Sequence, residues 1–185
     1  TEANFGQKPF KFPPPDGFQP LNTANTRPVK VISRPDQFVG VTTYRGDGSS
    51  GRVFHLGMSP DFVWVKRRDG TYDNMLFDTV RGDGKEIYSE RNYAQGSPAT
   101  SKLDFIANGF DLPSTGVNVN GNSYVAWFWK AGGPKFGGQG ANEFWVDGKN
   151  YASAAAAGLD DGDITPSAAS VGTKQGFSII KWLGV

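Results

Sequence analysis

Cysteine is absent from the 185-residue chain, and histidine occurs only once, as His55. The first absence excludes disulfides, thiolate metal sites and cysteine nucleophiles. A catalytic triad needs histidine beside a nucleophile and a carboxylate, and a zinc site usually takes more than one imidazole or thiolate. Because the chain has only this one imidazole, we predict a structural or surface role for His55.

An excess of charge of either sign is also missing, because 19 Lys and Arg face 18 Asp and Glu. The densest basic run, Lys66–Arg68, is followed directly by Asp69. Nucleic-acid binding usually needs a basic patch or stripe, so we expect no nucleic-acid partner. No stretch of about 18 apolar residues and no charged-then-apolar leader occurs, which predicts neither membrane insertion nor a secretion signal.

Glutamate is scarce, and the acidic residues show no paired pattern along any one predicted strand. The glutamates are Glu2, Glu86, Glu90 and Glu143. Glycoside hydrolysis needs two carboxylates that face each other. We interpret Asp61, Asp73 and Asp78 as surface aspartates at strand ends and turns rather than as a catalytic pair. The chain is therefore predicted not to be an enzyme.

Glycine, proline and aromatic residues are plentiful, with 25 Gly, 12 Pro and 14% aromatics. Short aromatic and β-branched runs separated by Gly and Pro are typical of all-β domains. The predicted strands are 29–33, 37–45, 61–68, 74–80, 86–89, 103–106, 109–112, 124–130 and 143–146. Turns are expected at Asp69-Gly70, Asn120-Gly121 and Asp147-Gly148, and one short helix at Ser153–Ala157. We predict an all-β fold, a two-sheet antiparallel sandwich over residues 29–174.

The two ends of the chain differ from this central domain. Residues 1–28 carry four phenylalanines between prolines, which predicts an extended strap and linker rather than an independent fold. Residues 177–184 (FSIIKWLG) repeat the apolar pattern of residues 39–46 (VGVTTYRG). Residues 175–185 are therefore either a final strand or the start of a following repeat.

The most aromatic run, Tyr124–Lys130, alternates two sets of apolar side chains. Burial of both sets, in the core or at a subunit interface, is the simpler interpretation, and Asp61–Arg68 has the same pattern. Tryptophans also stack on sugar rings. If the chain binds a glycan, we expect the loops near Tyr72, Trp145 and Tyr151 to do so rather than the strand centres.

Three carboxylates lie within four residues at Asp160, Asp161 and Asp163. Calcium binds oxygen ligands of this kind, although it usually takes six to eight of them. The pattern is typical of a solvated turn, and calcium is the only cofactor for which the sequence offers ligands.

Several stretches resemble an uncharacterised repeat domain that is common in structural and tail-fibre-like proteins of marine phages, especially those of cyanobacteria. These stretches are 60–68 (PDFVWVKRR), 76–82 (LFDTVRG), Gly109-Phe110, 124–133 (YVAWFWKAGG) and 169–180, the last matching a join between repeats. Residues 4–25 resemble the closing strand of a SPRY-type domain. The resemblance implies a jelly-roll sandwich of the concanavalin or laminin-G type, displayed in tandem on a virion appendage, and no catalytic residues.

The resulting hypothesis is a non-enzymatic virion structural or adhesion module of a bacteriophage, part of a tail fibre or surface appendage. Its expected partners are other copies of itself and neighbouring virion proteins, and it would assemble in the cytoplasm of the bacterial host. A carbohydrate-binding module that recognises host glycans is the alternative. A glycan-degrading enzyme is the third hypothesis.

Overall fold

The computed structural model describes residues 32, 34–96, 103–134 and 141–184. The chain divides into two units, Thr1–Ser33 and Arg34–Val185, and nearly all the described residues lie in the second. The predicted strap (1–28) and the predicted strand 29–33 lie outside the described residues, apart from Ile32, which is in no strand.

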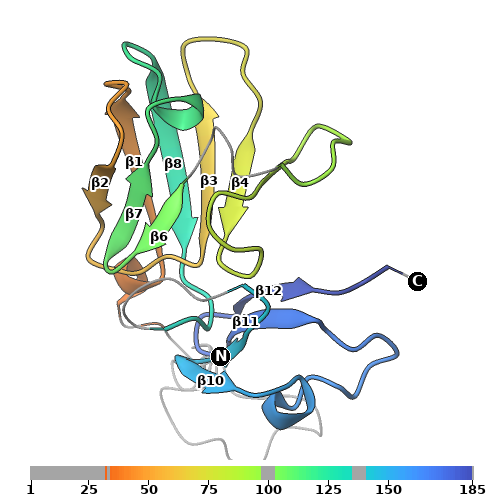
Figure 1. Cartoon of the computed structure of the whole chain (residues 1–185). Helices are drawn as coiled ribbons and strands as arrows, with labels where there is room; N and C mark the ends of the chain where they lie inside the picture. The colour runs from red at the N-terminus through yellow and green to blue at the C-terminus, as the bar shows by residue number, and fades with distance from the viewer. Residues whose placement is uncertain (1–31, 33, 97–102, 135–140, 185) are drawn as a thin grey trace, which may run out of the picture. The chain divides into compact units, whose positions relative to one another are not determined.

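The strands of this unit pair antiparallel except for one parallel pair, β9 with β11, and all the helical segments described are single 3-10 turns (Figure 1). Sheet A has the order β1-β8-β3-β4-β5 and sheet B the order β2-β7-β6. In sheet A the strands are β1 (Val39–Arg45), β8 (Ser123–Trp129), β3 (Phe62–Arg67), β4 (Met75–Asp78) and β5 (Glu86–Tyr88). In sheet B they are β2 (Arg52–His55), β7 (Gly109–Leu112) and β6 (Asp104–Ile106). The all-β antiparallel sandwich predicted from the sequence is confirmed, whereas the jelly-roll connectivity stays a prediction.

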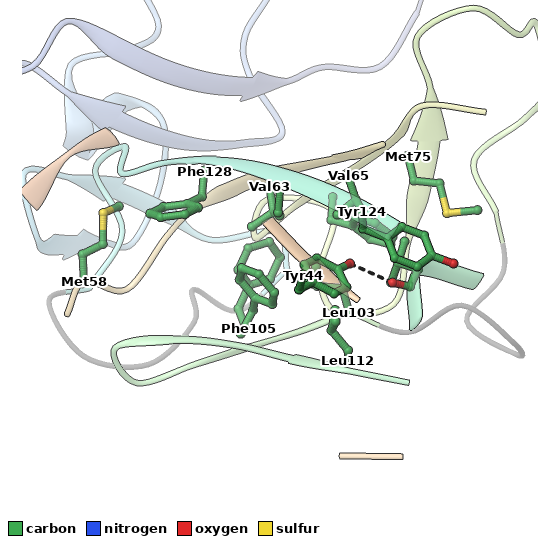
Figure 2. Packing of buried hydrophobic residues seen from close by; sticks show 14 residues of the cluster. Tyr44, Met58, Val63, Val65, Met75, Leu103, Phe105, Leu112, Tyr124 and Phe128 are labelled. Carbon is green, nitrogen blue, oxygen red and sulfur yellow. Dashed lines mark hydrogen bonds between the residues drawn. The ribbon is translucent and has the colours of Figure 1, made fainter. Parts of the chain in front are cut away.

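The core lies between sheets A and B and combines aromatic with aliphatic side chains (Figure 2). Alternate residues of β3 and β8 point into it, so that Val63, Val65, Tyr124, Ala126 and Phe128 are buried. The rings of Tyr44 and Tyr124 stack there with their centroids 5.2 Å apart. Their hydroxyls donate to the backbone of η2 (Gly116–Asn118), Tyr44 to Val117 O at 2.7 Å and Tyr124 to Gly116 O at 3.1 Å. A polar tip that finds a backbone acceptor lets tyrosine serve as a core residue.

A third sheet was not predicted from the sequence. Sheet C has the order β10-β9-β11-β12 and is formed by β9 (Phe144–Val146), β10 (Lys149–Tyr151), β11 (Ala168–Gly172) and β12 (Phe177–Lys181). The predicted turn at Asp147-Gly148 joins β9 to β10, with positive φ at both residues, as a two-residue hairpin requires. Strand β12 pairs with β11, so residues 177–181 form a strand of this sheet. Whether a repeat follows stays a prediction.

The predicted helix at Ser153–Ala157 is a single 3-10 turn, η3 (Ala155–Ala157). Ser153 Oγ accepts a hydrogen bond from Ala156 N at 3.1 Å, and Gly158 ends the turn in the left-handed conformation at φ 66°. A third 3-10 turn, η1 (Pro35–Gln37), leads into β1.

Candidate functional site

The outer face of sheet A carries a row of apolar side chains that crosses the whole sheet. The registers of the strand pairs place Val41, Trp127, Trp64, Leu76 and Ile87 side by side. Val41 is 60% exposed, and the other four are partly exposed. The rings of Trp64 and Trp127 meet edge to face with centroids 5.8 Å apart. We call these five residues the outer-face row.

The predicted burial of β3 and β8 within the chain therefore holds for the inner face, whereas the tryptophans of the outer face stay partly exposed, and their burial at a subunit interface stays a prediction. Sheet B covers the inner face. Among the described residues of sheet C, Ile179 and Ile180 of β12 line a pocket together with Ile87 of the outer-face row, and Phe177 of β12 contacts the aromatic rings of the outer face. Its ring lies 6.1 Å from that of Trp129 and 6.0 Å from that of Phe62. Apolar side chains that lie at least partly exposed in a continuous row are typical of surfaces that contact other molecules.

A buried carboxylate holds the loop that leaves β8. Asp61 is 0% exposed, and its Oδ2 accepts hydrogen bonds from Ala131 N at 2.8 Å and Gly133 N at 3.2 Å. The Lys130 Nζ lies 2.9 Å from the same oxygen and also donates to Pro134 O at 2.7 Å. Burial raises the pKa of Asp61 and lowers the pKa of Lys130, and the charge of each partner opposes the shift of the other. The pair has a structural role, because Asp61 Oδ2 and Lys130 Nζ already bind each other and backbone groups of the chain.

The same loop is joined to sheet C. Gly132 N donates to Ser170 Oγ at 3.1 Å and Gly148 N donates to Gly132 O at 2.9 Å. From the β11–β12 turn, Gln175 Nε2 donates to the carbonyls of Lys130 and Ala131 at 3.0 and 2.7 Å. These bonds fix sheet C against one end of the sandwich.

A pocket of about 410 Å³ lies at this junction. The sandwich contributes Phe38, Met58 and the exposed Gln37 and Asn108, while the turns of sheet C contribute Asp147 and Lys174. Thr173 N donates to Asp147 Oδ1 at 2.9 Å, and the Thr173 hydroxyl donates to Asp147 Oδ2. Partial burial opposes ionisation of Asp147, but these hydrogen bonds outweigh it and lower its pKa. The lining of the pocket thus combines apolar side chains with amide, ammonium and carboxylate groups.

Comparison with known proteins gives one match. A family described as a domain of unknown function, DUF7483, matches residues 34–185. This chain belongs to the DUF7483 family. No curated protein and no solved structure matches it. The matched range coincides with the unit that contains all three sheets.

The residues predicted to bind a glycan are not brought together in this DUF7483 domain. Tyr72 is 43% exposed and lies in the β3–β4 loop, at the end of β3 opposite Asp61. Trp145 pairs with Asn150, whereas Tyr151 pairs with Phe144, so the two rings point to opposite faces of the β9–β10 hairpin. Trp145 Nε1 donates to Glu143 Oε2 at 2.7 Å, and Lys149 Nζ lies 4.7 Å from the centre of the Tyr151 ring.

The predicted calcium ligands lie in the loop between η3 and β11. Asp160, Asp161 and Asp163 are all exposed. Over residues 34–96, 103–134 and 141–184, no three His, Cys, Asp or Glu side chains are grouped so that they could hold a metal ion. Calcium binding therefore stays a prediction without a preformed site.

Two aspartates predicted to be at the surface are buried instead. Asp61 is 0% and Asp78 1% exposed, and their cationic partners are Lys130 and Arg81. The prediction was wrong because it treated strand ends as solvated, while here loops and sheet C cover them. Asp73 is partly exposed and pairs with Arg91 at 2.9 Å. His55, at the end of β2, is exposed.

Sequence reasoning missed Gln175 and Lys130, whose roles depend on contacts between segments far apart in the chain. It also missed the exposure of Trp64 and Trp127, although it singled out the runs that contain them. In the described part of the chain, no helix has the length and apolar character needed to cross a membrane.

Proposed function

We propose that this DUF7483 chain is a non-enzymatic structural and adhesion module of a bacteriophage virion, built into a tail fibre or a related surface appendage. The observation that carries the proposal is the outer-face row, an apolar band of Val41, Trp127, Trp64, Leu76 and Ile87 on a fixed sheet. The sequence resemblance to repeat domains of marine phage appendages gives this surface its biological setting.

The action of such a module is mechanical. Sheets A and B enclose a core of aromatic and aliphatic side chains, and the Asp61–Lys130 pair and Gln175 fix sheet C against it. Because sheet C is bonded to the sandwich at several places, the domain transmits force between neighbouring proteins without bending between its sheets. Its partners in this proposal are other copies and neighbouring virion proteins, which would bury the outer-face row.

Immunogold electron microscopy of the phage that encodes the chain tests this proposal. An antibody against residues 34–185 is expected to label appendages of intact particles, with an unrelated phage as the control. Particles that contain none of the chain, by labelling and by mass spectrometry of their proteins, contradict the proposal.

The second candidate function is carbohydrate binding, and the junction pocket favours it. Ligand pockets typically enclose about 300–1,000 Å³ and combine apolar walls with a few polar groups, as the 410 Å³ pocket does. Calorimetric titration with glycans found on a glycan array measures this directly. Binding that is lost in Lys174→Ala, while Trp145→Ala binds normally, assigns the glycan to the pocket. Binding that is lost in Trp145→Ala but kept in Lys174→Ala assigns the glycan to the β9–β10 hairpin. If the chain binds no glycan at all, this candidate function is contradicted.

A further inference from the structure

Among the strands that the structure describes, β1 is an edge of sheet A. It pairs with β8 on one side only, along its whole length from Val39 to Arg45. The other edge strand of this sheet, β5, has only three residues, and the chain folds back on it, where Gly96 N donates to Glu86 O at 2.9 Å. The β5 edge is thus short and covered by a following segment of the chain, whereas the β1 edge is long and has no paired strand beyond it in the described residues.

The hydrogen bonds at the two ends of β1 show which backbone groups face outward. Lys130 N donates to Phe38 O and Gly46 N donates to Asn122 O, both at 2.8 Å. In an antiparallel pair the bonded residues alternate, so the even-numbered residues from Phe38 to Gly46 face β8. The backbone N–H and C=O groups of Val39, Val41 and Thr43 point away from β8, and no other described strand pairs with them.

The side chains of these three residues are also exposed, Val39 by 43% and Val41 by 60%. Soluble proteins usually protect such edges with lysine, proline, a bulge or a very short strand. Strand β1 is seven residues long, and it contains no charged residue before Arg45. An unprotected β-branched edge of this kind is suited to pairing with another strand.

We propose that β1 pairs antiparallel with β1 of a second copy, about a two-fold axis through Val41. In this register Val41 lies opposite Val41 of the other copy, and Val39 opposite Thr43. Three hydrogen-bonded pairs form, each exchanging two N–H···O bonds, and every outward backbone group of the three residues gains a partner.

The second copy fits this edge because the strand is complementary to itself. A C2 interface brings the same patch of both copies together, and the facing side chains are β-branched and uncharged. Arg45 comes level with Gln37 in η1 of the other copy, so no like charges lie opposite each other along the paired strands. The outer-face row also becomes continuous across the two copies, since Val41 is one of its members.

This inference rests on the proposed function and names a partner for it. It converts two five-stranded sheets into one ten-stranded sheet. The apolar face presented to other virion proteins would then be twice as wide.

Sedimentation equilibrium of the whole chain with a charge exchange at position 41 tests the pairing. The wild-type chain is expected to form a dimer. Val41→Lys and Val41→Glu, each alone, place like charges opposite each other and are expected to dissociate at least about tenfold more readily. An equimolar mixture of the two variants is expected to dimerise again, because Lys then faces Glu.

Ile164→Lys is the matched control, since Ile164 is 50% exposed in the loop before β11, and it should dimerise like the wild type. Circular dichroism shows whether each variant is folded, and amide exchange at Val39, Val41 and Thr43 should slow on dimerisation. A monomeric wild type, variants that dimerise unchanged, or a mixture that stays monomeric overturns the pairing. A monomeric chain that is nevertheless found in virions overturns this inference alone, and a dimeric chain absent from them overturns only the proposed function.

Discussion

At the scale of single residues, two glycines in the loop after β8 allow two close approaches. A Cβ atom on Gly132 would lie 2.0 Å from Val171 O, and one on Gly133 would lie 2.0 Å from Asp61 Oδ1. Both distances are far below van der Waals contact, so Gly132 is needed for β11 to lie beside this loop, and Gly133 is needed for the loop to lie against the Asp61 carboxylate. The small, fully buried Ala168, Ala169 and Ser170 of β11 fit the same close approach.

Gly132→Ala is therefore expected to lower the free energy of unfolding by about 2 kcal/mol or more, because backbone atoms must move apart. Gly162→Ala is the matched control, since a Cβ there meets nothing within 4 Å. Urea denaturation measures both. If the two variants are equally stable, Gly132 and Val171 do not pack as closely in solution as they do in this structure.

Asp47 is expected to make stability depend on pH. Hydrogen bonds from the backbone N–H and hydroxyl of Ser49 and from the Asn118 amide lower the pKa of Asp47 from 3.8 to about 2. A carboxylate whose pKa is lower in the folded state contributes stability above its unfolded pKa, and this contribution is lost as the pH falls towards about 2.

Asp47→Asn removes the titrating group but keeps an acceptor oxygen, so the loss of stability between pH 4 and about 2 should become smaller. Thermal unfolding midpoints across this range are the measurement, with Asp163→Asn at an exposed loop position as the control. If the Asp47 variant retains the full acid dependence of the wild type, other carboxylates are responsible.

At the scale of elements, the buried pair Asp61–Lys130 joins the start of β3 to the loop after β8. Removing one partner of a buried ion pair usually costs about 3–5 kcal/mol, because the other charge stays buried without its partner. Lys130→Met should therefore cost about 3 kcal/mol. The double variant with Asp61→Asn should cost less than the sum of the single changes, as a denaturant double-mutant cycle would show. Additive effects would contradict the coupling.

Elements with strong patterns could be predicted, and those without them could not. Strands β1, β3 and β8 are rich in β-branched or aromatic residues, β4 begins with three apolar residues, and the predicted ranges of all four overlap the observed ones. Strand β2 is short and carries Arg52 and His55, while β11 consists of small residues with weak strand preference. Sheet C went unpredicted because it depends on β11.

The candidate site was less accessible to sequence reasoning than the fold. Alternation along Tyr124–Trp129 shows that the strand has two apolar faces, but not that only one of them is covered. The burial of Asp61 depends on Lys130, Ala131 and Gly133, which are far away in the sequence. These partners come together because of the order of the strands in the sheet, and a local sequence pattern does not reveal that order.

At the scale of the whole molecule, the account makes sheet A the surface through which the domain contacts its neighbours. The most direct test is amide hydrogen exchange, measured by mass spectrometry, of the chain in the assembled appendage and of the free chain. The account predicts that exchange at Val39, Val41 and Thr43 slows strongly in the assembly, while the loop at 160–163 exchanges equally in both. Unchanged exchange along β1, with protection confined to the junction pocket or the loop around Tyr72, would contradict it.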